Sequence, residues 1–485
     1  MAFSKIEIIL NRFSLLSFIV PFVYRLLLEL YAYPFALGYD VMAFYVPFLL
    51  GYAELSPLRL YATAPLYYLA LHAMYGLTGD PIVAVKVVAV LLEGFLGFAL
   101  YMWGFVVFKS RVKALIFSLL TSFYFIILRL SWDLHRNVLG LSLALLMLSV
   151  VYGWWSFKVR SSLSLSLAVL TALAHQLCPL ILVSALLPRI LRRCRLSIAV
   201  ASVSLVFWLS IVYASSIASS RGLYNQLLSY LALLAPSIEQ LFPVGLSALE
   251  FLAYAVMPLI PFLAYSIMRG IKQRCDFRFL LPAFSWLAFC IVMTPFMSFG
   301  YRFVLLAPIP IIMMTTAFSG KKVTMALSAI VLMLGLGYTL CSAYSPFPYF
   351  NEPIMWRQEF KYAIPTSILQ NTVPLEDSPS LARIMKTATS IAYSRAKSIF
   401  LISRPMLGYA LLSGLPKDKI VVYGDPIERN SSIMASYLKE GYEVYLVWWM
   451  QGYKWYGAEI NDIVDGHAYS ITYCEEPFAL YLIER

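Results

Sequence analysis

Apolar runs of about 18 residues or more, long enough to cross a bilayer as helices, recur through the first 345 residues and constrain the fold most strongly. Only 13% of the 485 residues are charged and 61% are hydrophobic. Soluble domains carry roughly 25% charged residues. The sequence therefore predicts a polytopic membrane protein whose first 345 residues form an all-α bundle of transmembrane helices.

The basic residues are concentrated in this apolar part. Residues 1–345 contain 24 Lys and Arg against 10 Asp and Glu, and residues 346–485 contain 13 against 15. Short loops rich in Lys and Arg remain on the cytoplasmic side of a membrane. The net charge of +12 therefore indicates orientation in a bilayer, and we expect no nucleic-acid partner. The first span lacks a small-residue cleavage site, so we expect it to remain as a membrane helix.

The segment Ser161–Leu191 decides the predicted topology. As a single span it would place Arg189 and the three arginines that follow it on the outer side, against the positive-inside rule. A break at His175-Gln176-Leu177-Cys178-Pro179 divides the segment into two short helices and returns those arginines to the inner side. We adopt this hairpin, which also places His175 and Gln176 at the outer face.

With this hairpin the chain has about eleven spans. We expect a cytoplasmic N-terminus, an exterior C-terminal domain and a location in the plasma membrane. The spans are Phe13–Tyr33, Ile82–Phe108, Ala114–Leu130, Val138–Trp155, the two helices of Ser161–Leu191, and approximately 196–218, 246–268, 279–297, 302–318 and 323–343. Within the first span, Arg25 and Glu29 are spaced to form an i,i+4 ion pair.

Residues 346–485 have the composition of a soluble domain, in contrast to the transmembrane catalytic domain predicted for residues 1–345. Patterns typical of strands and helices alternate in this part, which predicts a small exterior α/β domain. Strands are expected at Ser398–Ile402, Lys419–Tyr423 and Glu443–Trp449, helices at Met406–Ser413 and Ser431–Glu440, and a final hairpin at Tyr469–Tyr473 and Ala479–Ile483.

One carboxylate stands in the loop that follows the first span. Asp40 is the only charged residue of Leu37–Pro47, and a carboxylate beside a membrane helix is costly to desolvate. We interpret it as a catalytic base, which takes the proton of an acceptor hydroxyl. The alternative interpretation is a residue that caps an interfacial helix.

Further polar residues are predicted on outer loops, where a transferase would need cations to stabilise a departing lipid phosphate. Each of these residues also has a structural interpretation. Asp133 and Arg136 could form a surface ion pair. His135 could lie at the membrane interface, and His175 could be a hydrogen-bonded residue of the hairpin. Arg302, and Lys86 near the start of a span, have the alternative of snorkelling towards headgroups.

The stretch Ala64-Pro65-Leu66-Tyr67-Tyr68, continued by Tyr75-Gly76-Leu77-Thr78-Gly79-Asp80 and Ala84-Val85-Lys86, resembles the Pro-Leu-aromatic motif of integral-membrane glycosyltransferases of the GT-C fold. The most similar branch is the dolichyl-phosphate-mannose–protein mannosyltransferase and aminoarabinose transferase group. The first exterior loop with Asp40 and Tyr45, the hairpin with His175-Gln176, and the late span that opens with Gly300-Tyr301-Arg302-Phe303 agree with this resemblance, which covers roughly residues 20–320.

The resemblance implies a hexosyl- or pentosyltransferase that moves a sugar from a polyprenyl (dolichyl-type) phosphate to an acceptor hydroxyl of a protein, lipid or glycan. It implies a single inverting displacement at the outer membrane face, with Asp40 as the catalytic residue. The expected substrate-binding residues are Tyr39, Tyr45, Asp133, His135, Arg136, His175, Gln176, Tyr301 and Arg302. If Asp40 and Asp133 converge, the two carboxylates would hold a divalent cation, as acidic loops do in the related oligosaccharyltransferases.

Two features depart from the family pattern. Asp40 stands alone where many relatives have two adjacent acids, and Ala64-Pro65 replaces a basic-Pro-Pro run, so the phosphate-binding cation must come from elsewhere. The alternative function is a transporter or flippase of lipid-linked sugars. Such a protein would be expected to show an internal repeat and polar groups in mid-membrane helices.

Overall fold

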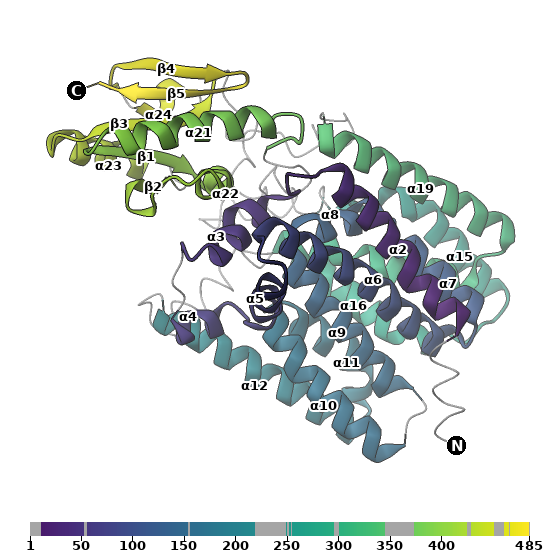
Figure 1. Cartoon of the computed structure of the whole chain (residues 1–485). Helices are drawn as coiled ribbons and strands as arrows, with labels where there is room; N and C mark the ends of the chain where they lie inside the picture. The colour runs from purple at the N-terminus through teal and green to yellow at the C-terminus, as the bar shows by residue number, and fades with distance from the viewer. Residues whose placement is uncertain are drawn as a thin grey trace, which may run out of the picture.

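The computed structural model describes residues 11–52, 56–153, 156–218, 249, 252–253, 255–294, 300–344, 373–423, 428–450, 460–464 and 466–484. The described part up to Tyr344 is a bundle of helices, and the residues from Val373 onward form a small sheet domain at one end of this bundle (Figure 1). The predicted helical bundle and C-terminal α/β domain are therefore confirmed. The predicted boundary at residue 345 lies outside the described residues.

The bundle combines long apolar helices with shorter ones. Among the described residues, six helices (α2, α6, α9, α10, α12 and α19) are long and apolar enough to cross a membrane, and the bent pair α7–α8 makes a seventh if it is one span. The helices are α2 (Arg12–Tyr31), α3 (Val46–Leu49), α4 (Pro57–Ala62), α5 (Leu66–Thr78), α6 (Pro81–Phe108), α7 (Arg111–Ser122), α8 (Phe125–Asp133), α9 (His135–Tyr152), α10 (Phe157–Ala174), α11 (Cys178–Leu191), α12 (Arg195–Ala218), α15 (Ile260–Lys272), α16 (Leu281–Met293), α17 (Gly300–Leu306), α18 (Pro308–Phe318) and α19 (Lys321–Tyr344), with η1 (Val41–Tyr45), η2 (Met257–Leu259) and η3 (Arg278–Leu280).

The predicted third span, Ala114–Leu130, is a bent pair of helices and not a single helix. The chain forms two helices, α7 and α8, whose axes differ by 64° at a break after Ser122. Tyr124 is extended at this break, and its hydroxyl donates a 2.6 Å hydrogen bond to the carbonyl of Ala255. A Cβ at Gly335 of α19 would lie 2.3 Å from the Phe123 carbonyl oxygen, so the glycine lets α19 approach the broken backbone closely.

The predicted break at His175 is confirmed. Helix α10 ends at Ala174, and α11 begins at Cys178. At one end of α11 the Cys178 side chain contacts the carbonyl of Asn137, and at the other end Arg189 donates to the carbonyl of Val151. Because Asn137 and Val151 lie near opposite ends of α9, α11 runs parallel to α9, and the chain reverses direction at His175.

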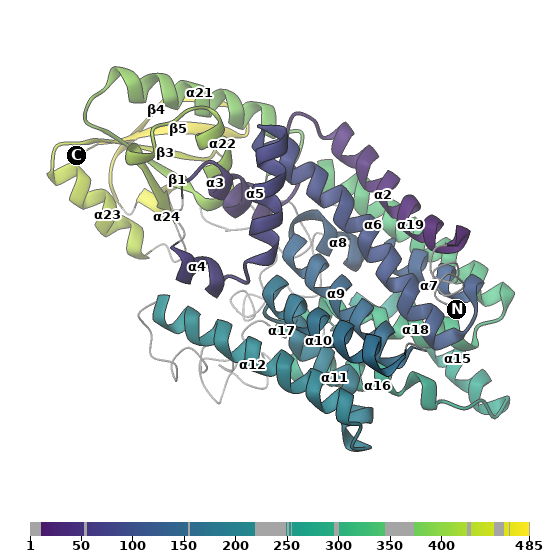
Figure 2. The ribbon, with the colours of Figure 1, turned by 60° about the horizontal axis from the view of Figure 1, so that its bottom comes forward.

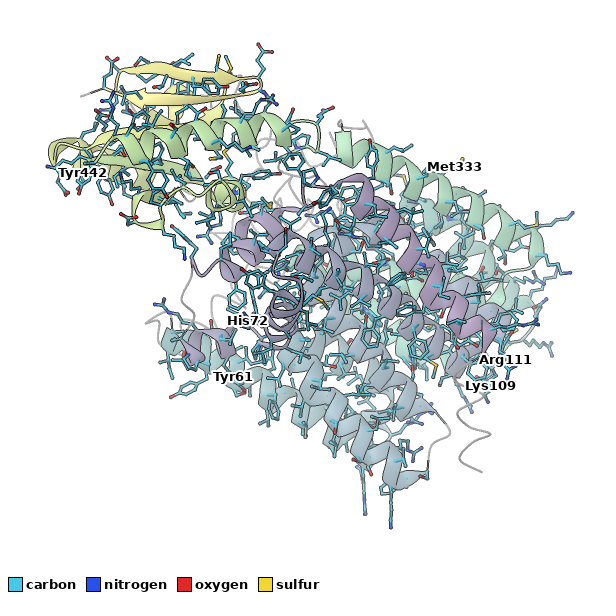
Figure 3. The ribbon with its side chains drawn as sticks, viewed as in Figure 1. Tyr61, His72, Lys109, Arg111, Met333 and Tyr442 are labelled. Atoms are coloured by element: carbon cyan, nitrogen blue, oxygen red, sulfur yellow. The ribbon has the colours of Figure 1, made fainter. Side chains whose placement is uncertain are left out.

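The basic loops gather at the end of the bundle remote from the C-terminal domain. Lys109 and Arg111 lie there (Figure 3). The Lys113 ammonium donates a 2.7 Å hydrogen bond to Ala317 at the end of α18, and Arg189 lies 4.2 Å over the ring of Tyr152 at the end of α9. Tyr61 and His72 lie at the opposite end (Figure 3). This separation of charge between the two ends agrees with the orientation expected of a membrane bundle.

Helix α19 exposes apolar side chains on the outside of the bundle. Met325, Met333 and Leu336 are each at least 60% exposed, and Met333 points away from the bundle (Figure 3). A long apolar helix with a continuous exposed apolar face is stable where hydrocarbon, rather than water, covers it. The described part of the chain therefore has the character of an integral membrane protein.

A buried ion network joins α2 to α6. The Arg25 guanidinium donates to Glu29 Oε1 at 2.5 and 3.0 Å, as the spacing predicts. Lys86 of α6 donates to Glu29 Oε2 at 3.0 Å and to the Glu29 carbonyl at 2.7 Å. All three residues are buried. The prediction that Lys86 snorkels is therefore wrong, because its ammonium finds a carboxylate on the neighbouring helix inside the bundle.

Small residues allow α2 to approach α6 closely. A Cβ at Gly97 would lie 2.1 Å from the carbonyl oxygen of Ser17, and one at Gly94 would lie 3.0 Å from the Phe18 ring. Small residues at such positions are typical of helix pairs packed in membranes. The close contact brings Glu29 within reach of Lys86.

The C-terminal domain has a five-stranded sheet with strand order β2-β1-β3-β5-β4. Strands β1, β2 and β3 are parallel, whereas β5 runs antiparallel to both β3 and β4. Its elements are α21 (Ser378–Ser394), β1 (Ser398–Ser403), η6 (Arg404–Met406), α22 (Leu407–Leu412), η7 (Lys417–Lys419), β2 (Ile420–Tyr423), α23 (Glu428–Lys439), β3 (Glu443–Trp449), α24 (Ile460–Val464), β4 (Tyr469–Glu475) and β5 (Phe478–Ile483). The predicted strands and helices are confirmed, and α21 and α24 are additional.

We predict that replacement of Glu29 by Ala destabilises the bundle strongly. It leaves the charges of Arg25 and Lys86 buried without their shared carboxylate, and breaking a buried pair in this way costs about 3–5 kcal/mol. Thermal unfolding of the protein in detergent measures the effect. Arg278→Ala is the control, since the Arg278 side chain is 81% exposed and exposed pairs contribute about 0–1 kcal/mol. Equal shifts for the two variants would contradict the prediction.

Candidate functional site

The Asp40 loop leads from α2 into the short helix η1. Gly38 has a φ of 103°, in the region that glycine adopts most easily. Asp40 immediately precedes η1, a single π-helical turn, and π-helical segments occur frequently at functional sites. The Asp40 side chain makes no capping hydrogen bond to this turn and is 9% exposed. The capping interpretation is therefore not supported, and the Asp40 carboxylate lies buried at the start of the turn.

Arg136 is the cation next to Asp40. The Asp40 carboxylate interacts electrostatically with the Arg136 guanidinium, which also bonds to the hydroxyl of Tyr45. A second Arg136 nitrogen donates a 3.0 Å hydrogen bond to the carbonyl of Thr63, and the guanidinium lies 5.5 Å from the centroid of the Tyr68 ring. These contacts hold Arg136 between the Asp40 loop and the segment that begins α5. They leave the predicted Asp133–Arg136 ion pair untested, because the Asp133 side chain lies outside the described ones.

The motif Ala64-Pro65-Leu66-Tyr67-Tyr68 packs against Tyr45 and thereby supports the Asp40 loop. Ala64 has a φ of 61°, which turns the chain into α5. Tyr67 bonds to Nδ1 of His135 at 2.9 Å, and the rings of Tyr67 and Tyr45 lie 4.8 Å apart. His135 is buried and stacks on Tyr45, with their centroids 5.5 Å apart. The interfacial interpretation of His135 is therefore wrong, since its ring joins an aromatic cluster beneath η1.

The turn of the α10–α11 hairpin packs against the same region. Nε2 of Gln176 donates a 2.9 Å hydrogen bond to the carbonyl of Ala62, so this side chain secures the end of α4. His175 accepts from the backbone N–H of Leu177 at 3.2 Å. A Cβ at Gly140 of α9 would lie 2.8 Å from the Cβ of His175, so this glycine allows the turn to approach α9 closely.

Two cations act on His175. Burial, together with the nearby charges of Arg302 and Arg136, lowers the pKa of His175 well below its ordinary value. The imidazole is therefore neutral at pH 7. Burial and the Asp40 carboxylate likewise raise the pKa of Tyr45 well above its ordinary value, so its hydroxyl stays protonated. The site thus combines one carboxylate, two guanidinium groups and neutral hydrogen-bonding side chains.

The structure brings some of the predicted site residues together. The Asp40 loop, Arg136, His175 and Arg302 are linked through the electrostatic contacts above. Tyr39 lies at the edge of the loop, where its ring meets Phe44 at 6.1 Å. The side chains of Asp133 and Tyr301 lie outside the described ones.

The predicted divalent cation gains no support from the donor set that is described. No three His, Cys, Asp or Glu side chains cluster in the described part of the chain. The charged neighbour of Asp40 is Arg136, and a guanidinium disfavours a second cation beside the same carboxylate. The metal site at Asp40 and Asp133 stays a prediction, because the Asp133 side chain lies outside the described ones.

Tyr67, Tyr68 and Thr63 belong to the site although the sequence did not place them there. Tyr67 and Tyr68 belong to the Pro-Leu-aromatic motif, and Thr63 directly precedes it. The resemblance gave these side chains no role. The structure supplies the role, because Thr63 and Tyr68 hold Arg136, and Tyr67 holds His135.

Neither the comparison with protein-family models nor the comparison with curated proteins returned a match to this chain.

We predict that His175 makes the folded protein sensitive to acid. Its folded pKa is depressed, so the unfolded chain binds a proton more readily as the pH falls below about 6.5, the ordinary value for histidine. The contribution of His175 to the free energy of unfolding is fully present above that pH. Below it the free energy of unfolding decreases by up to about 1.4 kcal/mol per pH unit. Unfolding temperatures in detergent between pH 7.5 and pH 5, scanned as roughly half-unit steps, measure the slope.

The variant His175→Gln should lose much of this acid-induced decrease. His72→Gln is the matched control, since the His72 side chain is exposed on α5, and it should keep the slope of the unmodified protein. Identical pH dependence in all three proteins would contradict the assignment.

Proposed function

We propose that this chain is an integral-membrane glycosyltransferase that moves a sugar from a polyprenyl-phosphate donor to an acceptor hydroxyl. The observation that carries the proposal is the convergence of Asp40, Arg136, His175 and Arg302. These residues come from four separate segments, and each acts electrostatically on at least one other at the same end of the bundle. A buried carboxylate that interacts with Arg136, together with a second guanidinium, Arg302, that acts on His175, matches the needs of this transfer.

Asp40 is the general base of the reaction. Arg136 acts electrostatically on this carboxylate, which takes the proton of the acceptor hydroxyl in this proposal. The acceptor oxygen then attacks the anomeric carbon from the face opposite the phosphate. The bond between that carbon and the phosphate oxygen breaks, and the configuration inverts in one displacement.

Arg302 binds the lipid phosphate and stabilises the charge that develops as it leaves. Arg136, whose guanidinium contacts Thr63, Tyr45 and Tyr68, has a different role in this proposal. Arg136 acts on the position and charge of Asp40. Neutral His175, adjacent to both arginines, supplies a hydrogen-bonding group without adding a third positive charge.

The polypeptide crosses the membrane eleven times in this proposal. Helices α2, α6, the pair α7–α8, α9, α10, α11, α12, α15, α16, the pair α17–α18 and α19 supply the crossings. The shorter helices still run between the two ends: α11 reaches from Asn137 to Val151 of α9. The N-terminus is cytoplasmic and the C-terminal domain is exterior, in the plasma membrane, because the basic loops occupy the opposite end.

We predict that a cysteine at Arg193 and the native Cys474 lie on opposite sides of the membrane. Arg193 follows α11 in the basic loop, and Cys474 is exposed on β4 of the C-terminal domain. A membrane-impermeant thiol reagent applied to intact cells should label Cys474 and should label the Arg193→Cys position only after permeabilisation. Labelling of both positions in intact cells would contradict the topology.

We predict that Asp40→Asn abolishes sugar transfer while leaving donor binding largely intact. Asparagine preserves shape but cannot act as a base, and general-base catalysis contributes about 10²–10⁴-fold to the rate. The assay is transfer of labelled sugar from a polyprenyl phosphate by the purified protein. Asp80→Asn is the matched control. Asp80 caps α6 through hydrogen bonds of 2.7 and 3.0 Å, and asparagine is an equally good cap.

Arg302→Ala should differ from Asp40→Asn by weakening donor affinity as well as turnover, with the exposed Arg59→Ala as its control. Near-normal transfer by Asp40→Asn would exclude Asp40 as the base. Movement of the intact lipid-linked sugar across the bilayer, without transfer to any acceptor, would instead identify a transporter or flippase.

A further inference from the structure

The C-terminal domain touches the Asp40 loop directly. Helix α22 lies beside η1 and α3 in both views of the molecule (Figures 1 and 2). The closest approach is at Gly408: a Cβ there would lie 2.8 Å from the carbonyl oxygen of Met42 and 2.9 Å from the Met42 side chain. Only glycine permits this approach, which places the domain against the backbone of the turn that follows Asp40.

Three side-chain contacts extend this interface along the loop. The guanidinium of Arg404 lies 5.2 Å from the centroid of the Phe44 ring, and the rings of Tyr409 and Phe35 are 6.3 Å apart. The ammonium of Lys417 donates a 3.1 Å hydrogen bond to the carbonyl of Gly51. These contacts lie before, within and after the turn that Asp40 begins, so the domain holds the whole segment from Phe35 to Gly51.

The interface is closely packed. The cavity between the two parts, lined by Gly38, Tyr39, Met42, Val373, Pro405 and Tyr409 among others, has a volume of about 10 Å³. A space of this size is at the lower limit for one water molecule. No sugar or lipid fits in this cavity, so the contact between the described residues of the domain and the loop supports the loop and does not bind substrate.

The loop needs such support. η1 is a π-helical turn of five residues, and the Asp40 side chain does not cap it. π-Helical turns are rare and short, and a segment this short gains little stability from its own hydrogen bonds. The buried Tyr45 side chain anchors one side of the turn in the bundle, against Tyr67 and His135, while Gly408 and Arg404 contact Met42 and Phe44 on the other side.

We propose that the C-terminal domain holds the Asp40 loop in its working conformation, with Gly408 and Arg404 as positioning residues. The proposal rests on the proposed function, since it assigns the domain the task of presenting the catalytic base. Misplacement of a catalytic group by about 1 Å costs up to about 10²-fold in rate, so loosening the interface should lower turnover without removing any group that contacts substrate.

Gly408→Ala tests the proposal in the full-length protein. Hydrogen exchange of the peptide covering residues 38–46 should become faster, and kcat for sugar transfer should fall by about tenfold to a hundredfold. The KM for the donor should remain within about twofold, because Arg302 is untouched. Gly337→Ala is the matched control. Gly337 also lies in a helix, where an added Cβ meets nothing within 4 Å, and both readouts should stay unchanged.

Arg404 gives a second, independent variant if Gly408→Ala does not fold. Arg404→Ala should reproduce the faster exchange and lower kcat, and Arg404→Lys should restore part of both because it keeps a cation over the Phe44 ring. Arg383→Ala is the control within the domain. Its side chain pairs with Glu475 at 2.9 Å, within the domain itself.

Hydrogen exchange and kcat together distinguish failure of the positioning role from failure of the proposed function. Unchanged exchange of residues 38–46, or faster exchange with unchanged kcat, would overturn the positioning role while leaving a glycosyltransferase. Absence of transfer in the unmodified protein would overturn the proposed function, and with it the catalytic part of this inference. In that case, faster exchange in Gly408→Ala alone would still show that the domain holds the loop.

Discussion

The shared carboxylate of Glu29 is the interaction on which the rest of the structure depends. Two cations, Arg25 and Lys86, lie inside the bundle, where an unpaired charge is costly. Glu29 meets both within 3.0 Å, and this fixes the rotation and the height of α2 relative to α6. Since the Asp40 loop follows directly from α2, the same network sets where that loop leaves the bundle. The charge pairing therefore positions the candidate catalytic base from several turns away.

The candidate site forms where helices are interrupted. η1 is π-helical, the chain breaks between α8 and α9 at Leu134, and it breaks again at His175 between α10 and α11. Interrupted backbone in a membrane protein is tolerated where other groups satisfy its hydrogen bonds. Arg136 binds the carbonyl of Thr63, and Gln176 binds that of Ala62. The polar residues thus have two tasks, because they complete the backbone at the interruptions and bring charged groups together there.

Several features of the fold were predictable because a single local rule governs each of them. Positive loops remain inside, which required the break at His175 that the structure contains. Local patterns typical of strands located β1, β2, β3, β4 and β5 of the C-terminal domain. The bend within the third span was not predicted, because the sequence around Phe123 contains no proline or glycine. Its break is stabilised by Ala255 and by the close approach of Gly335, which are far along the chain.

The sequence alone determined that the chain has the character of an integral membrane protein and which of its loops are basic, since hydropathy and loop charge are local properties. Only the tertiary structure decided what the polar residues contact. Lys86 became an internal partner of Glu29 instead of a surface residue, His135 entered an aromatic cluster with Tyr45, and Gly408 met the Asp40 loop. The physical reason is that a buried charge or an uncapped turn is stabilised by whichever partner the packed helices bring near, and sequence distance carries no information about that partner.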